Sequence, residues 1–280
     1  MLFDVIVDGA KDSVRLLPFL FLAFFILELF EHDSDRLNQK ILIRFRKAGP
    51  FIGALLGCIP ECGIPVLAAN LFAASLISPG TLLSVFLSTS DEAILVLLGT
   101  ANHPDIILQL LIAKFSIALI CGYAVDFFFA KQSQGNKAVE IQPHACSCSG
   151  HSHNLFLHAL QHTVNLFCYI LLFTLILNFL LEVIGFKNLA SMLLKGSLLQ
   201  PILAAIIGLI PNCAASILLT KLYTQGILSF ASLIAGLCSS TGVGLAILAK
   251  TYPDKKEVCK LVAILFGCSA LIGILLSFFL

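Results

Sequence analysis

Charged side chains are scarce in this sequence. They make up 12% of the 280 residues, while 59% of the residues are hydrophobic. A soluble domain carries about 25% charged residues, so this chain has too few to cover its surface in water. The shortage excludes a soluble protein and predicts an integral, multi-pass protein of the cell membrane, surrounded by the lipid bilayer. The formal net charge of +1 also leaves no basic surface for nucleic acid.

The sequence also lacks the motifs of several enzyme classes. It contains no Walker motif, no His-Glu-x-x-His zinc motif and no Gly-x-Ser-x-Gly elbow. We therefore expect no enzyme and no tightly bound cofactor. Ten cysteines are present, but most lie in apolar segments, which indicates buried packing residues and not a disulfide scaffold. Cys121, Cys168 and Cys268 are expected to be inert core residues.

The two halves of the chain carry the same landmarks at a constant offset of 151 residues. Prolines, cysteines and short hydroxyl runs recur in the same order, which is the signature of an internal repeat. Helix-breaking motifs at corresponding positions of two membrane-embedded halves indicate the binding site of a secondary transporter. The matched pairs are Pro50 and Pro201, Pro60 and Pro211, Cys62 and Cys213, and the runs 88–90 and 239–241.

Five apolar regions in each half predict an all-α polytopic membrane protein of about ten helical segments. The sequence divides into a first transmembrane repeat at 1–130, a linker at 131–154 and a second repeat at 155–280. The first-half regions are 14–31, 49–59, 64–77, 80–98 and 106–130, and the second-half regions are 157–183, 198–210, 214–225, 226–249 and 259–280.

The second and third regions of each half have only about half the length needed to span a bilayer. Prolines at 60–65 and at Pro211 interrupt them, because proline removes a backbone donor and clashes with the preceding turn. These segments are predicted to form a broken helix or a re-entrant hairpin with its tip near the membrane midplane. Short full spans remain the alternative.

Lysine and arginine placement predicts the topology. The loops at 32–47 and 250–260 are basic and are expected to be cytoplasmic, together with the 131–154 linker, whereas the 99–105 turn has no Lys or Arg and is placed outside. Each half then has three full crossings, so the second half must be inverted relative to the first. Four crossings per half would give a parallel repeat instead.

Three carboxylates and several polar side chains lie inside apolar sequence at the repeated motifs. An ionisable group at bilayer depth costs at least about 2.5 kcal/mol, so such groups are functional by default. Helix capping is the competing interpretation of the acids, and interhelical hydrogen bonding that of the hydroxyls. The predicted substrate-binding residues are Glu61, Cys62, Ser88, Ser90, Asp91, Glu92, Asn212, Cys213, Ser240 and Thr241.

The linker contains a short tract rich in cysteine and histidine. Such a tract indicates transition-metal binding, although a solvated flexible loop would be compatible with it. The predicted metal ligands are His144, Cys146, Cys148, His151 and His153.

The segments 57–63 and 208–213, each with an Ile-Pro-x-Cys motif, and Ser90-Asp91-Glu92-Ala93 resemble the ten-span heavy-metal exporter family, whose members are labelled arsenic efflux or manganese transporters. The resemblance covers nearly the whole chain and implies a polytopic permease with these motifs along an efflux path.

The leading function is a secondary exporter of manganese, arsenic or another heavy metal that works by alternating access. Thiolates suit soft metals and metalloids, whereas carboxylates suit manganese. Asn212 replaces Glu61 across the repeat, and this asymmetry suits a cation coupled to protons. The alternatives are a proton-coupled permease for a small organic solute and an intramembrane enzyme. The sequence leaves a homo-oligomer open.

Overall fold

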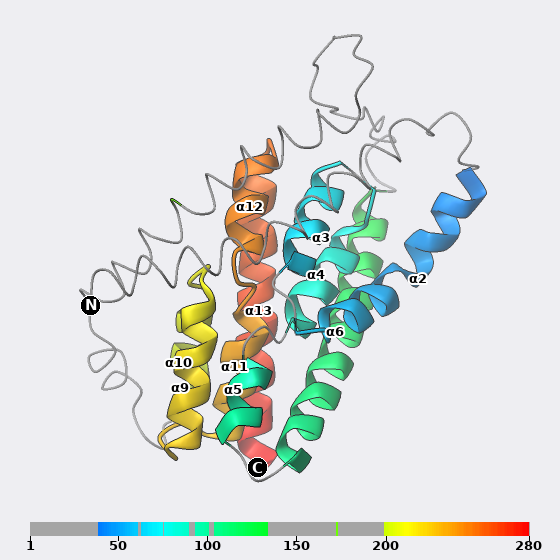
Figure 1. The fold of residues 1–280 in the computed structure, drawn as a ribbon. Coiled ribbons are helices and arrows are strands. Elements are labelled where there is room, and N and C mark those ends of the chain that lie inside the picture. The colour runs from blue at the N-terminus through cyan, green and yellow to red at the C-terminus, as the bar shows by residue number, and fades with distance from the viewer. Residues whose placement is uncertain are drawn as a thin grey trace.

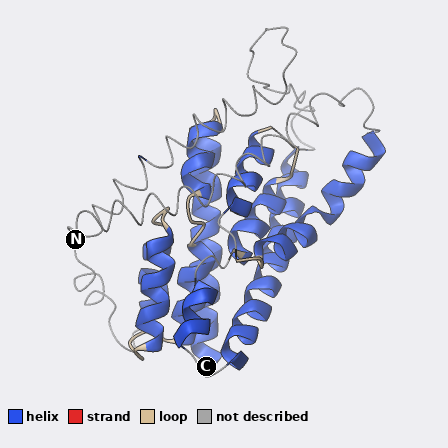
Figure 2. Cartoon of the chain, viewed as in Figure 1, coloured by secondary structure: helices blue, strands red, loops and turns tan. Residues whose placement is uncertain are grey.

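The computed structural model describes residues 39–60, 63–74, 76–89, 93–100, 104–133, 172 and 199–279. These residues form helices and connecting turns, without a strand among them (Figures 1 and 2). The all-helical, polytopic class predicted from the sequence is confirmed. The predicted first span at 14–31, nearly all of the linker and nearly all of the 157–183 region lie outside the described residues.

The first half contributes α2 (Gln39–Gly57), α3 (Gly63–Ala73), α4 (Pro79–Ser88), α5 (Ala93–Thr100) and α6 (Pro104–Ser133). The second half contributes α9 (Gln200–Gly208), α10 (Cys213–Thr224), α11 (Phe230–Ser239), α12 (Gly244–Thr251) and α13 (Lys255–Phe279). Adding 151 to both bounds of α4 and α5 gives the bounds of α11 and α12. The same offset carries the start of α6 onto the start of α13.

The helix starts repeat in atomic detail as well. Ser78 caps α4 with an extended backbone (φ −78°, ψ 158°), and its hydroxyl accepts a hydrogen bond from the amide of Thr81. Ser229 caps α11 in the same way (φ −74°, ψ 158°), accepting from the amide of Ser232. A cap of this kind satisfies one of the donors that a helix start leaves unpaired.

The two capped starts are anchored by different side chains. At α4, Asp126 of α6 accepts from the Ser78 hydroxyl at 2.7 Å and from the Gly80 amide at 2.8 Å. At α11, Gln200 of α9 accepts from the Ser232 hydroxyl at 3.1 Å and donates to the Ile227 carbonyl at 2.9 Å. The halves therefore share a backbone plan but differ in the polar groups that hold it.

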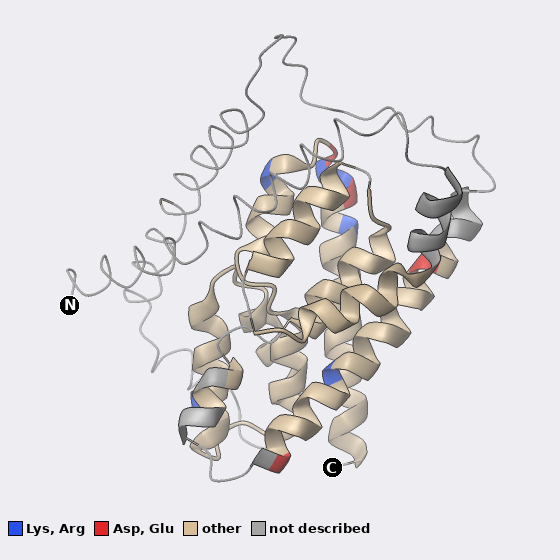
Figure 3. Ribbon diagram, turned by 45° about the vertical axis from the view of Figure 1, so that its right-hand side comes forward, with Lys and Arg blue, Asp and Glu red and all other residues tan. Residues whose placement is uncertain are grey.

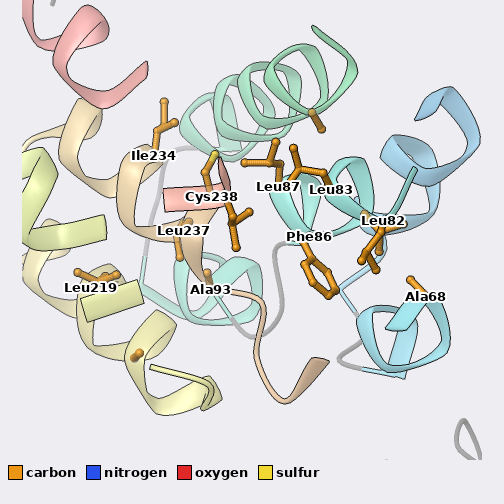
Figure 4. Close-up of a cluster of buried hydrophobic side chains, with 14 of the residues drawn as sticks. Ala68, Leu82, Leu83, Phe86, Leu87, Ala93, Leu219, Ile234, Leu237 and Cys238 are labelled. Atoms are coloured by element: carbon orange, nitrogen blue, oxygen red, sulfur yellow. The ribbon is translucent and has the colours of Figure 1, made fainter. Parts of the chain in front are cut away.

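The packing pairs are preserved when the two halves are exchanged. Helix α4 packs against α2 and α6, and α11 packs against α9 and α13. The short helices cross over: α3 packs on α12, and α10 packs on α5. Helices α4 and α11 also contact each other, and Leu83, Leu87, Leu237 and Cys238 meet at this contact (Figure 4). The two halves thus share one hydrophobic core.

Among the described residues, three stretches are long and apolar enough to cross a membrane: Asp105–Phe128, Phe230–Thr251 and Lys255–Phe279. Shorter apolar helices are Ala48–Gly57, Gly63–Ala73, Pro79–Ser88 and Cys213–Thr224. Most charged residues of the described helices lie toward the helix ends (Figure 3), whereas Lys114 lies in the middle of α6. Large apolar side chains are exposed along α6 and α13, as a lipid-facing surface requires, and include Leu108, Ile112, Ile120, Phe127, Phe128, Leu271, Leu275 and Phe278.

The fourth apolar region of each half forms two helices, whereas the sequence analysis treated each as one segment. In place of a single helix over 80–98, α4 ends at Ser88 and α5 begins at Ala93. In the second half, α11 ends at Ser239 and α12 begins at Gly244. Figure 1 places α5 at the lower end of the molecule and α12 at the upper end, with the C-terminus of α13 at the lower end.

Candidate functional site

Two helix breaks at equivalent positions of the repeat define the candidate site. Thr89 leaves α4 with φ −54° and ψ 124°, and Ser240 leaves α11 with φ −78° and ψ 105°. Both residues are buried, as is Thr241. Backbone that leaves a helix inside an apolar core exposes carbonyl groups that need partners.

Lys114, in the middle of α6, supplies such a partner. Its side chain has 0% exposure, and its ammonium donates to the Thr89 carbonyl and, at 3.1 Å, to the Leu237 carbonyl. Thr89 is the C-cap residue of α4, and Leu237 lies in the last turn of α11. One ammonium therefore joins the broken helices of the two halves.

The sequence analysis missed Lys114, although a signal was present. A lysine in the middle of the apolar 106–130 region meets the criterion that was applied to the acidic residues, because a charge at bilayer depth requires a specific reason. Its counterpart at the 151 offset is Leu265, which is 1% exposed. The two halves of the site therefore differ in charge at position 114 and its counterpart 265, a difference that the sequence analysis did not use.

The two proline-marked breaks lie between α2 and α3 and between α9 and α10. In the second half, the Asn212 side chain caps α10 and accepts from the amide of Ala214 at 3.3 Å. Cys213 is the first residue of α10 and is buried. Its carbonyl accepts from the Ser216 hydroxyl at 2.7 Å.

The start of α3 lies against the start of α12. A Cβ atom added at Gly244, the first residue of α12, would come within 2.6 Å of the Cβ of Pro65 in the first turn of α3. The helix that follows the proline-marked break of the first half therefore begins beside the helix that follows the α11 break of the second half.

The described hydroxyls occupy two kinds of environment. Ser88 donates to the Ser84 carbonyl at 2.7 Å, and its repeat counterpart Ser239 donates to the Ala205 carbonyl at 2.8 Å. Ser240 is 2% exposed, and its hydroxyl has no hydrogen-bond partner among the described residues. A buried polar atom without a partner costs free energy and calls for an explanation.

The structure places Ser88, Ser240 and Thr241 at the α4 and α11 breaks, and Asn212 and Cys213 at the α9–α10 break. Their role in substrate binding stays a prediction. In the part of the chain that the structure describes, no three His, Cys, Asp or Glu side chains form a group able to hold a metal ion. The remaining predicted ligands lie outside that part: Glu61, Cys62, Ser90, Asp91, Glu92, His144, Cys146, Cys148, His151 and His153.

Two thiols that were expected to be inert lie near each other. The thiols of Cys121 on α6 and Cys268 on α13 are close enough to interact electrostatically. Sequence could not indicate this proximity, because the two residues belong to different halves and are not repeat counterparts.

We predict that Cys121 and Cys268 cross-link on mild oxidation in a variant that keeps these two thiols and replaces the other eight of the ten cysteines by serine. A disulfide requires a Cβ separation of about 3.5–4.5 Å, which neighbouring thiols on two helices can reach. Mass spectrometry after alkylation should find both thiols protected. A matched variant that keeps Cys259, which is exposed on α13, in place of Cys121 should stay fully alkylated. Equal alkylation of the two variants would contradict the proximity of Cys121 and Cys268.

The fold and the paired breaks define a polytopic helical membrane protein with a polar junction between two repeats. Residues 3–188 and 184–279 match the family described as "Putative, 10TM heavy-metal exporter", and the chain belongs to this family. The predicted family is confirmed, and with it a membrane transporter of the heavy-metal class. No curated protein and no solved structure matches the chain.

Proposed function

We propose that this protein is a secondary exporter of a metal or metalloid ion that works by alternating access of two inverted halves. The observation that carries the proposal is the pair of broken helices, α4–α5 and α11–α12, which meet at one buried junction. Discontinuous helices at a repeat interface are where secondary transporters bind substrate and coupling ions. Family membership supplies the substrate class, heavy metals.

The inverted relation of the halves is supported by their paths in Figure 1. Helix α6 starts at the lower end, next to α5, whereas α13 starts beside α12 at the upper end and reaches the C-terminus at the lower end. The exchange of short helices, with α3 on α12 and α10 on α5, suits a two-fold axis between the halves. We place the basic segments 32–47 and 250–260 and the linker in the cytoplasm, although the expected loops are partly helical: α2 begins at Gln39 and α13 begins at Lys255.

The substrate would bind where the breaks converge. Asp91 and Glu92 follow Thr89 closely in sequence, and Glu61 and Cys62 precede α3 directly. Cys213 and Thr241 are buried at the corresponding places of the second half. Oxygen ligands suit manganese, and thiolates suit arsenite and soft metals, so the set could serve either class of cargo. Protons are the proposed coupling ion.

The experiment that tests this function is a measurement of cellular metal content in a deletion strain exposed to a panel of metals and arsenite. The strain should accumulate at least one of them, and the restored gene should return the content to normal. Unchanged content across the panel would contradict metal export and would favour a permease for an organic solute.

We further propose that His144, Cys146, Cys148, His151 and His153 in the linker collect metal loosely and are dispensable for transport itself. Deletion of residues 144–153 should weaken resistance at low metal concentration and leave maximal export nearly intact. Growth assays and transport in vesicles, with a deletion of equal length at 134–143 as the control, would test this. Complete loss of export would contradict it.

A further inference from the structure

Lys114 is a buried cation between two helix ends. Its side chain is fully enclosed, and removal of an ammonium from water costs several kcal/mol unless well-placed partners compensate for it. Its partners include two backbone carbonyls at the C-terminal ends of helices, one in each half. The thiols of Cys58 and Cys238 lie within electrostatic range of the ammonium.

The carbonyl pair has the chemistry of a cation site. The C-terminal end of a helix carries a partial charge of about −0.5, and its last carbonyls have no partner within the helix. In transporters with discontinuous helices, such half-helix ends coordinate a small monovalent cation. The Thr89 and Leu237 carbonyls are arranged in this way, and the Lys114 ammonium occupies the place of the ion.

The counterpart of Lys114 in the second half carries no charge. The repeat counterpart of Lys114 is Leu265, which is buried in the core. The repeat counterpart of Thr89 is Ser240, whose hydroxyl is left without a partner among the described residues. The covalently tethered cation at the contact of α4 and α11 therefore has no equivalent at the matching position of the other half.

We propose that Lys114 is a built-in cation that fills a monovalent-cation site formed by the C-terminal carbonyls of α4 and α11 and locks the two halves together. The exporter would then need no bound sodium or potassium ion at this junction. The proposal rests on the proposed function only where export is measured, because occupancy of the site can be tested on the purified protein.

The first test removes the side chain and returns its atoms as a free molecule. Lys114→Ala deletes three methylenes and the ammonium, which n-propylammonium replaces atom for atom, and n-propanol is a neutral probe of the same size. In detergent without metal, n-propylammonium at ten times its dissociation constant should raise the melting temperature of this variant by about 3–6 °C. n-Propanol should raise it much less.

Leu265→Ala is the matched control, because it opens a cavity at the equivalent buried position without removing a charge. It should show no preference for n-propylammonium over n-propanol. An equal response of Lys114→Ala to both molecules, or the same preference in both variants, would overturn the proposal.

A second variant decides the matter if Lys114→Ala does not fold. Lys114→Met keeps the volume and leaves the two carbonyls without the ammonium, so it should melt below the wild type, whereas Leu265→Met should melt close to it. A buried charge without such a role is often replaced by an apolar residue at no cost. A Lys114→Met variant as stable as the wild type would therefore overturn the proposal.

Export measured in vesicles separates the two hypotheses. Wild-type export should not change when sodium and potassium are replaced by choline, and Lys114→Ala export should recover with n-propylammonium. If n-propylammonium stabilises Lys114→Ala but the wild type exports no metal, the proposed function is wrong and the cation site still stands. Metal export by Lys114→Ala at the wild-type rate, without any amine, would overturn the cation site and keep the function.

Discussion

Asp91→Asn and Glu92→Gln should abolish export if the cargo is a hard cation such as manganese, while the double variant Cys62→Ser with Cys213→Ser should be only mildly affected. Manganese is bound chiefly through oxygen, so loss of a carboxylate charge removes its main ligand. For arsenite or another thiol-seeking cargo the order should reverse. The variants should insert and fold, since each replacement is nearly isosteric and removal of a membrane-embedded charge lowers the insertion cost.

The two variant sets must be compared at matched expression, with export of each metal measured in inverted vesicles. Ser216→Ala is a suitable control, because its hydroxyl is buried and bonded to the Cys213 carbonyl without belonging to the predicted ligands. Loss of export in one set and not in the other identifies the ligand class. If neither set changes transport of any metal, the metal-binding assignment of these residues is wrong.

Gly208→Ala should sharply reduce the yield of folded protein. A Cβ atom at this position would come within 2.1 Å of the Gly236 carbonyl oxygen and within 2.2 Å of the Ser239 hydroxyl. A backbone carbonyl cannot rotate away, so α9 and α11 would have to separate, and overpacking of this kind costs about 1–3 kcal/mol or more. The repeat counterpart Gly57 has the same close contact, with the Ser88 hydroxyl at 2.0 Å.

Gly267→Ala on α13 is the matched control, because nothing lies within 4 Å of its added Cβ. Alanine should be neutral or slightly stabilising there, since glycine disfavours helix by about 1 kcal/mol. The monodisperse fraction in size-exclusion chromatography and the melting temperature would compare the two variants. A Gly208→Ala protein as stable as Gly267→Ala would contradict the close packing of α9 on α11.

The repeat offset could be found from the sequence because it depends only on the order of residues along the chain. The bounds of α11 and α12 follow from those of α4 and α5 by the same 151 residues that match Pro60 to Pro211. The sequence indicated the division of α4 from α5 only indirectly, through the interpretation of the acidic residues as helix caps. No proline marks that break, and the run from Ser88 to Ser90 gives weak evidence of it.

The tertiary features were beyond the sequence for a physical reason. Lys114 makes sense only when the ends of α4 and α11 converge on it, and that convergence depends on contacts between halves. The proximity of Cys121 and Cys268 likewise involves helices far apart in the chain. Offsets between repeats show which residues are equivalent, whereas they do not show which residues touch.

The most direct test of the central claim is flux of metal through the purified protein in proteoliposomes. Vesicles loaded with a panel that includes manganese and arsenite would be given a pH gradient, and the metal moved would be measured by mass spectrometry. We expect net movement of at least one metal or metalloid that depends on the gradient and is lost in Asp91→Asn or in the Cys62→Ser, Cys213→Ser variant. Absence of movement of every metal, with gradient-driven movement of an organic solute by the same vesicles, would contradict the account.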